Sequence, residues 1–246
     1  MTSLRNKLMH LIRATGWSVR RFFPDTCLAD YLHVLFHNLD INCVLDVGGR
    51  HGQFGEFLRD NGYRGDIISF EPVAENYRLL NHRCSRDSRW TGYHYALGSD
   101  DTTREINVTE STSFSSFLLP NDWGRKTFLG SAVKKMETVT VRRLDGILGE
   151  VTAHIDRPRI YLKMDTQGWD LEVFRGARGC RDDIMVLQTE LSVQPIYKSV
   201  IAWREAIMEF EQNGFAVSAL FPVSRDRNLR LVETDCVMVR SPLTIT

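Results

Sequence analysis

Two features of this sequence have residue types and spacing that suggest a ligand site. They are a glycine-rich turn and a set of acidic side chains at the ends of apolar runs. The turn reads Asp46-Val47-Gly48-Gly49-Arg50-His51-Gly52 and directly follows an apolar run. Glu71 ends the next apolar run, the pair Lys163 and Asp165 ends a later one, and Glu190 ends another. In an open sheet of parallel strands, ligands bind at the carboxyl ends of the strands. The sequence therefore predicts that these side chains meet at one ligand site.

The glycine turn differs from the dinucleotide-binding pattern G-x-G-x-x-G. In that pattern the second glycine lets the backbone approach a pyrophosphate, and here Arg50 stands at its position. A carboxylate on Asp46 would repel a pyrophosphate but suits a ligand with cationic groups. Glu71 is placed to accept hydrogen bonds from ribose hydroxyls. These features favour S-adenosylmethionine, which has no phosphate and carries a sulfonium and an ammonium group.

The elements that position these residues follow from the alternation of apolar runs and helical patterns. Strands are predicted over 42–47, 66–70, 93–97, 159–164, 184–191, 215–220 and 231–240, and helices over 53–61, 73–84, 169–177 and 202–213. Strands that alternate with helices form a parallel sheet through right-handed crossovers. We therefore predict a single α/β domain over residues 41–246.

This alternation breaks between residues 99 and 150. Two segments of period two, "TTREINV" and "ETVTVRRL", are predicted strands paired at an edge of the sheet. The segment between them is rich in Ser and Thr and is a predicted loop. A loop of that length in a compact domain is usually functional or mobile.

The composition is that of a globular protein without strong electrostatic character. Of the 246 residues, 43% are hydrophobic and 25% charged, and 31 basic residues balance 31 acidic ones. This balance argues against a nucleic-acid partner. The five cysteines are scattered without a C-x-x-C pair, which argues against a disulfide framework and a zinc site. We expect a cytoplasmic protein, and the oligomeric state stays open.

Residues 1–40 form a separate N-terminal segment. Leu4, Leu8, Leu11 and Ile12 fall at helical spacing, with five basic residues around them or shortly after. We expect an amphipathic helix that packs on the domain. Two alternatives stay open, a basic helix lying on an anionic membrane surface, which would make the protein peripheral at the membrane, and a disordered arm. No apolar run approaches the ~18–20 residues of a transmembrane helix.

Several segments, taken in order, resemble the FkbM family of S-adenosylmethionine-dependent methyltransferases. They include "VLDVGGRHGQFGEFLRDNGY", "IISFEPVAENYRLL", "STSFSSFLLP" and "YLKMDTQGWDLEVFRGA". The last is the most specific, and Asp170 and Phe174 depart there from the usual Glu and Leu. The resemblance implies a class I methyltransferase fold, a Rossmann-like and mostly parallel seven-stranded sheet with helices on both faces and an antiparallel last strand. It also implies methyl transfer to a hydroxyl, often on a sugar or polyketide.

The expected cofactor is therefore S-adenosylmethionine, bound by the turn and by the ends of the second and third strands. The predicted contacts are Asp46, Gly48, Gly49, His51, Gly52, Gln53, Glu71, Pro72, Ala96 and Leu97. Ser113 lies in a Ser-rich segment that matches the family's, and we add it as part of a lid over the cofactor or acceptor. A solvated loop is the alternative for that segment, and a simple turn residue is the alternative for His51.

Asp165, Lys163 and Glu190 are the predicted catalytic residues. In-line methyl transfer needs an oriented acceptor, and a positioned base accelerates it by ~10²- to 10⁴-fold. Asp165 is the first choice for that base or for orienting the acceptor. Lys163 points to the same side of its strand and would hold Asp165 ionised or contact the acceptor, the alternative being a structural salt bridge. Asp165, Glu190 and a histidine could bind Mg²⁺, but nothing in the sequence supports their convergence.

The predicted function is O-methylation of a sugar hydroxyl, and the basic N-terminus suggests a glycolipid of the cell envelope as the acceptor. A polyketide or small metabolite is the alternative acceptor within the same chemistry. From other classes, an NAD-dependent oxidoreductase and a non-catalytic nucleoside-binding module stay open. Arg50 at the position of the second glycine argues against the oxidoreductase.

Overall fold

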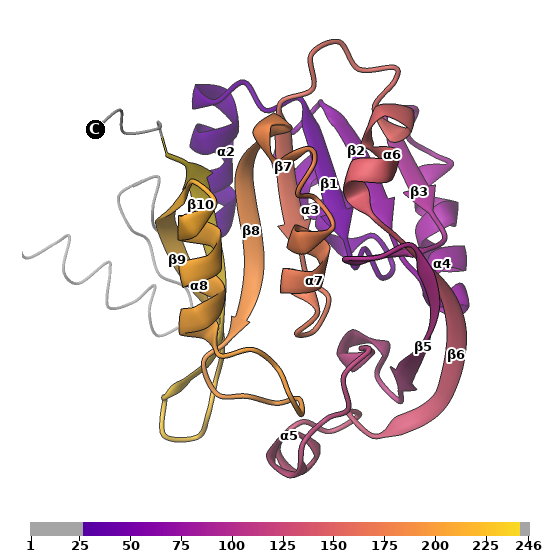
Figure 1. The fold of residues 1–246 in the computed structure, drawn as a ribbon, viewed down its shortest axis with the longest axis vertical. Helices are drawn as coiled ribbons and strands as arrows, with labels where there is room; N and C mark the ends of the chain where they lie inside the picture. Colours follow the sequence, from indigo (N-terminus) through magenta and orange to yellow (C-terminus); the bar gives the residue numbers. More distant parts are fainter. Residues whose placement is uncertain (1–26, 242–246) are drawn as a thin grey trace, which may run out of the picture.

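A seven-stranded sheet forms the centre of the computed structural model, which describes residues 27–241 (Figure 1). Its order is β3-β2-β1-β7-β8-β10-β9. β10 runs antiparallel to β8 and β9, and the other neighbours pair in parallel. The strands are β1 (Cys43–Val47), β2 (Asp66–Phe70), β3 (Trp90–Tyr93), β7 (Ile160–Met164), β8 (Ile184–Ser192), β9 (Phe215–Arg225) and β10 (Leu231–Arg240). The predicted fold class is confirmed.

Helices cover both faces of this sheet because its central strands are apolar on both sides. Every residue of β1 is buried, as is usual for a strand inside a parallel sheet. Val44 packs in one apolar cluster with residues of α2 (Leu28–Asn38), α3 (Gln53–Asp60) and α4 (Ala74–Cys84). Its neighbour Leu45 packs in the other, with α6 (Leu144–Val151), α7 (Asp170–Arg175) and α8 (Trp203–Gln212). Alternate residues of one strand therefore anchor helices on opposite faces.

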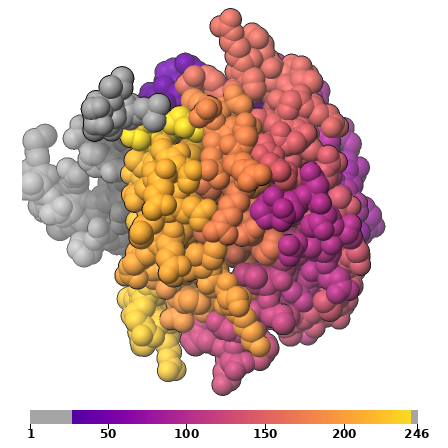
Figure 2. Space-filling model, in the orientation of Figure 1, coloured from indigo at the N-terminus to yellow at the C-terminus, as the bar shows by residue number. Residues whose placement is uncertain are grey.

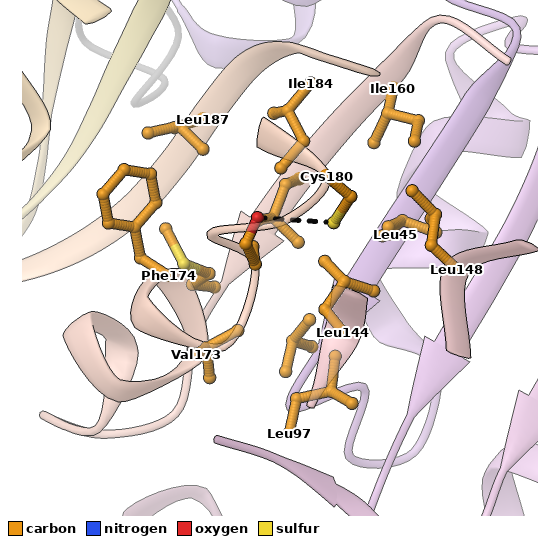
Figure 3. Close-up of a cluster of buried hydrophobic side chains, with 14 of the residues drawn as sticks. Leu45, Leu97, Leu144, Leu148, Ile160, Val173, Phe174, Cys180, Ile184 and Leu187 are labelled. Atoms are coloured by element: carbon orange, nitrogen blue, oxygen red, sulfur yellow. Dashed lines mark hydrogen bonds between the residues drawn. The ribbon is translucent and has the colours of Figure 1, made fainter. Parts of the chain in front are cut away.

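The larger of the two clusters joins the sheet to α6 and α7. Figure 3 shows Leu45, Ile160 and Leu187 from three strands meeting Leu144 and Phe174 from these helices. Cys180 is buried in the same cluster, and its Sγ donates a hydrogen bond to the carbonyl of Ala177 at 3.4 Å.

A second, three-stranded sheet corrects the predicted organisation of residues 93–142. Its order is β4-β6-β5, from β4 (Ala96–Leu97), β5 (Thr102–Thr109) and β6 (Val133–Arg142). The predicted strand over 93–97 is wrong as a unit, because β3 ends at Tyr93 and Ala96 pairs with Val141 of β6 instead. The two period-two segments do pair, antiparallel to each other, but in this separate sheet. The local pattern predicted β5 and β6 as strands, but it did not separate β4 from β3 or indicate which sheet these strands join.

Two helices had no recognised signal in the sequence, α5 inside the predicted loop and α6 after the second period-two segment. α5 (Asp122–Thr127) begins at Asn121, whose side chain accepts a hydrogen bond from the Gly124 amide and so caps the helix. α6 is short and carries two glycines, which weaken a helical pattern. The short 3₁₀ helices η1 (Thr112–Phe114) and η2 (Arg181–Asp183) were also not expected.

Within the N-terminal segment 1–40, the structure describes residues from 27 onward, where α2 buries Leu32 and Phe36 against the sheet. The predicted amphipathic pattern at residues 4–12 lies outside the described residues. Among the helices of residues 27–241, none is long and apolar enough to cross a bilayer.

Candidate active site

A cavity of about 610 Å³ lies at the carboxyl ends of the central strands, between the two sheets. This volume falls within the range of small-molecule binding sites. The three predicted catalytic residues Lys163, Asp165 and Glu190 line it. Nine of the predicted cofactor contacts line it as well, namely Asp46, Gly48, Gly49, Gln53, Glu71, Pro72, Ala96, Leu97 and Ser113. The predicted residues therefore meet at one site, although they come from six segments of the chain.

His51 and Gly52 are the two predicted cofactor contacts that do not line this cavity. The His51 ring points to α4, where Nε2 lies 3.0 Å from Asn76 Oδ1. Gly52 begins α3 in the left-handed region, with φ 89°. The structure thus brings neither residue into the cavity wall, but it places the ring of His51 beside Asn76, which does line the cavity.

The backbone N–H groups of the glycine turn are already engaged inside the protein. Gly48 and Gly49 both donate to the carbonyl of Phe70, at 3.0 Å each, and Arg50 N donates to Glu71 Oε2 at 2.8 Å. His51 N donates to the side chain of Gln53 and Gly52 N to the carbonyl of Gly49. A phosphate-binding loop needs such N–H groups free to point at the anion. This turn therefore does not offer a pyrophosphate cradle.

Glu71 is the buried carboxylate at the end of β2. Its Oε1 accepts from Val73 N at 2.8 Å and from Asn76 Nδ2 at 3.3 Å, while Oε2 accepts from Arg50 N. A carboxylate offers about four acceptor sites, so at least one remains for a ligand hydroxyl. Burial raises the pKa of Glu71 to about 7, against the opposing effect of these hydrogen bonds.

Lys163 lies between two carboxylates on neighbouring strands. Its Nζ is 3.0 Å from Asp165 Oδ2 and 3.5 Å from Asp46 Oδ1, and 4.8 Å from the ring centre of Phe54. Burial lowers the pKa of this ammonium, but the two carboxylates more than offset it and the net pKa is raised. For Asp165, burial raises the pKa, but the positive charge and hydrogen bond of Lys163 lower it. The net pKa of this carboxyl group lies below its ordinary value. Asp165 is thus held ionised at the site.

Gln167 connects the two predicted catalytic carboxylates, a link with no signal in the sequence. Its Nε2 donates to Glu190 Oε2 at 2.7 Å and lies 3.2 Å from Asp165 Oδ1. Its Oε1 accepts from the hydroxyl of Tyr197 at 2.7 Å, and its carbonyl accepts from Ser116 Oγ at 2.8 Å. The backbone of Gln167 has φ 56°, which costs a non-glycine residue about 1 kcal/mol or more. The surrounding hydrogen bonds hold it there.

Glu190 and Glu233 add further negative charge to the cavity. Burial, and next the charge of Asp165, raise the pKa of Glu190 well above its ordinary value. Glu233 comes from β10 and lines the cavity too; burial raises its pKa, against a hydrogen bond from Ser224 Oγ at 2.8 Å. No local sequence pattern indicates Glu233 as a site residue, since only the antiparallel pairing of β10 with β8 brings it to this edge.

The Ser-rich segment forms part of the cavity wall. Thr112, Ser113, Phe114 and Ser115 line it, and Arg50 Nε donates to Thr112 Oγ1 at 3.3 Å. This contact connects the segment to the glycine turn.

Three aromatic residues in or near the cavity, Trp169, Trp123 and Tyr197, lie in different environments. Trp169 lines the cavity. Tyr197 is buried with Ile196 and Val232, and Trp123 packs on the edge of that cluster.

In the part of the chain that the structure describes, no group of three or more His, Cys, Asp or Glu side chains is placed to hold a metal ion.

The cavity fits S-adenosylmethionine by the chemistry of its walls. Carboxylates of Asp46 and Glu71 suit cationic and hydroxyl groups, and Phe70, Leu97 and Ile106 form an apolar side that suits a flat base. With the sheet order, these features define a class I S-adenosylmethionine-dependent methyltransferase. The chain belongs to the FkbM methyltransferase family, because the family described as Methyltransferase FkbM domain matches residues 46–217.

Three solved structures to which this chain is similar are distant from it in sequence. A methyltransferase FkbM from Methylobacillus flagellatus KT is 15% identical with a TM-score of 0.48, over 81% of this chain and 44% of that one. This chain thus spans less than half the length of that protein. Fibrillarin from Aeropyrum pernix, solved with natively bound S-adenosyl-L-methionine, is 11% identical with a TM-score of 0.44, covering 80% of this chain and 66% of that one.

An rRNA methylase from Streptococcus thermophilus is 9% identical with a TM-score of 0.46, over 91% of this chain and all of the other. No curated protein matches the sequence. The family assignment rests on the match over residues 46–217.

Proposed function

We propose that this chain transfers a methyl group from S-adenosylmethionine to a hydroxyl of a sugar, carried by a glycolipid of the cell envelope. The observation that supports this most directly is the ionised Asp165 in the cavity. Its side chain is 37% exposed, while its partner Lys163 is 9% exposed. The carboxylate therefore faces the open space in which an acceptor hydroxyl would lie.

Asp46, Glu71 and the turn at Gly48 and Gly49 would hold the cofactor, with Ala96 and Leu97 against its base. When bound, the cofactor supplies an electrophilic methyl group. Residues of the chain would orient the acceptor hydroxyl and remove its proton.

Asp165 would orient the acceptor by accepting a hydrogen bond from its hydroxyl, and it would take the proton as the oxygen becomes nucleophilic. A base placed in this way typically contributes ~10²- to 10⁴-fold in rate. Lys163 keeps Asp165 ionised, and Gln167 fixes the direction of its Oδ1. Glu190, with its raised pKa, lies on the other side of Gln167 and offers a second polar contact to a polyhydroxylated acceptor.

A sugar suits the remaining walls of the cavity. Carboxylates accept hydrogen bonds from hydroxyls, and an aromatic ring such as that of Trp169 packs against an apolar sugar face. Methylation of a polyketide or small metabolite is the competing acceptor class, and it would use the same base. Membership in a methyltransferase family removes the oxidoreductase alternative.

The test uses S-adenosylmethionine labelled in its methyl group, incubated with the protein and fractionated host extract. We expect label in a glycolipid fraction, and its loss with Asp165→Asn. Label only in water-soluble products would discard the glycolipid acceptor and keep the methyltransferase. A protein that binds S-adenosylhomocysteine but labels nothing in any fraction would favour the non-catalytic module.

A further inference from the structure

Three segments of the chain form one rim beside the cavity, residues 119–135, 194–201 and 223–230, which include α5 and the ends of β6 and β9. Lys198 N donates to the carbonyl of Leu119 at 2.8 Å, which joins the first two segments. Gln194 N donates to the carbonyl of Val232 at 3.1 Å, next to the third. Phe128 and Val223 line the cavity itself. Figures 1 and 2 show α5 and the β9–β10 hairpin at the same end of the molecule. We call these segments the rim.

The rim exposes large apolar side chains at its tips. Leu129, just after α5, is 94% exposed, and Leu229, in the hairpin between β9 and β10, is 74% exposed. Leu119, Val133 and Val223 are exposed as well. Each tip exposes a leucine to solvent. Binding to a partner that buries both leucines would therefore be favoured by the removal of their apolar surface from water.

The rim is also basic, although the chain as a whole carries no net charge. Its three segments contain eight basic and two acidic residues. Each acidic residue pairs within its own segment, Asp122 with Arg125 and Asp226 with Arg230. Lys135 pairs with Glu137 just outside the rim.

Other basic residues of the rim remain free of such pairs. Lys126, Lys134 and Arg227 are exposed and form no ion pair with the described residues. Positive charge therefore surrounds the exposed leucines.

We propose that the rim docks on an anionic lipid bilayer, with Leu129 and Leu229 inserted among the acyl chains and the basic side chains on the lipid phosphates. Leucine together with lysine and arginine is the combination that binds such an interface. The cavity mouth then faces the membrane, and a lipid-linked sugar reaches Asp165 without leaving the bilayer. The purpose of this contact rests on the proposed function, but the contact itself does not require an acceptor or turnover.

The experiment measures binding of the full chain to vesicles by co-sedimentation. One set of vesicles is phosphatidylcholine alone and the other is phosphatidylcholine mixed with phosphatidylglycerol. We expect binding to the mixed vesicles that falls as salt rises. The double variant Leu129→Ser/Leu229→Ser and the double variant Lys126→Glu/Arg227→Glu should each weaken it by about tenfold or more.

The matched control is Arg78→Glu/Leu79→Ser on α4, where Leu79 is also exposed. It changes the same residue types away from the rim and should bind like the unchanged protein. Binding of S-adenosylhomocysteine shows that every variant is folded, since none of these side chains lines the cavity.

Several results would overturn the proposal. They are no binding of the unchanged protein to the mixed vesicles, equal binding by the rim variants, and an equal loss in the α4 control. If the rim instead binds a nucleic acid or a protein, the unchanged protein should not bind the mixed vesicles. Methyl transfer in extract without vesicle binding would reject the docking and leave the proposed function intact. Vesicle binding without methyl transfer would support the docking and count against the proposed function.

Discussion

The carboxylates of the site differ because their neighbours differ. Asp165 has Lys163 at 3.0 Å and stays ionised, while Glu190 is buried close to other carboxylates and holds its proton more tightly. Environments that push the pKa values of two carboxyl groups apart are typical of sites with separate acid and base roles. The proposed roles, Asp165 as the base and Glu190 as a second polar contact to the acceptor, rest on this difference.

Replacing Asp165 by Asn should lower kcat by about 10²- to 10⁴-fold, because the amide cannot take the proton of the acceptor hydroxyl. Binding of S-adenosylhomocysteine should change little. Turnover with labelled S-adenosylmethionine and calorimetric titration measure the two quantities. Unchanged turnover would remove Asp165 from its role as the base.

Glu71 should make cofactor binding depend on pH. Its pKa of about 7 in the protein without ligand lies above the ordinary value, and the ionised form accepts hydrogen bonds from ribose hydroxyls more strongly than the protonated form. Affinity for S-adenosylhomocysteine should therefore be full above pH ~8 and weaken as pH falls through ~7 to ~5.

The variant Glu71→Gln tests this assignment through the shape of the pH profile. It should bind more weakly at high pH and lose the pH-dependent step, as measured by titration calorimetry at several pH values. A step of the same size in the variant would assign the titration to another group.

At the scale of elements, the loops after β1 and β7 meet at very close range. A Cβ on Gly48 would lie 2.1 Å from the carbonyl oxygen of Asp165, and Gly48 has φ 84°. Both the conformation and the contact therefore require glycine. The glycine turn and the predicted base are thus positioned against each other, although they are far apart in the sequence.

Gly48→Ala should cost about 2 kcal/mol or more of unfolding free energy, since it adds left-handed strain and a clash with the Asp165 carbonyl. The shift of the β7 loop should also weaken cofactor binding. Urea unfolding and titration with S-adenosylhomocysteine measure both. Gly62→Ala provides a matched control, because φ there is 89° but no atom lies within 4 Å of the added Cβ. Equal losses in the two variants would mean that strain alone, and not the contact, explains the effect.

At the scale of the whole molecule, two apolar clusters on opposite faces of one sheet support the site. Phe174 is fully buried, with its ring centre 4.8 Å from that of Phe210 and 5.9 Å from that of Phe215. These contacts fasten α7 to α8 and β9. Phe174 stands where the family usually has Leu, and the cluster accommodates the larger ring.

Phe174→Ala should destabilise the fold by about 3–5 kcal/mol, through lost burial and the cavity it leaves. The exposed Leu79→Ala should change stability by less than about 1 kcal/mol. The midpoints of urea unfolding compare the two variants. A small effect at Phe174 would mean that neighbouring side chains close the cavity.

The sequence by itself determined the strands and helices around β1, β2, β7 and β8. Their apolar runs and glycine stops are local signals, and local backbone preferences act within a few residues. It also placed Asp46, Glu71, Asp165 and Glu190 at strand ends, and parallel strands share one ligand-binding edge. For these four residues, the order of the elements was enough.

Only the tertiary structure decided which sheet β4 joins, where the His51 ring points, and that Glu233 and Gln167 reach the cavity. Each of these depends on contacts between segments distant in the chain, such as the register of β10 against β8 or the hydrogen bond from Tyr197 to Gln167. The alternation of apolar and polar residues along a strand determines which of its faces is buried, but it does not determine which strand pairs with it. That choice is made by packing across the whole molecule.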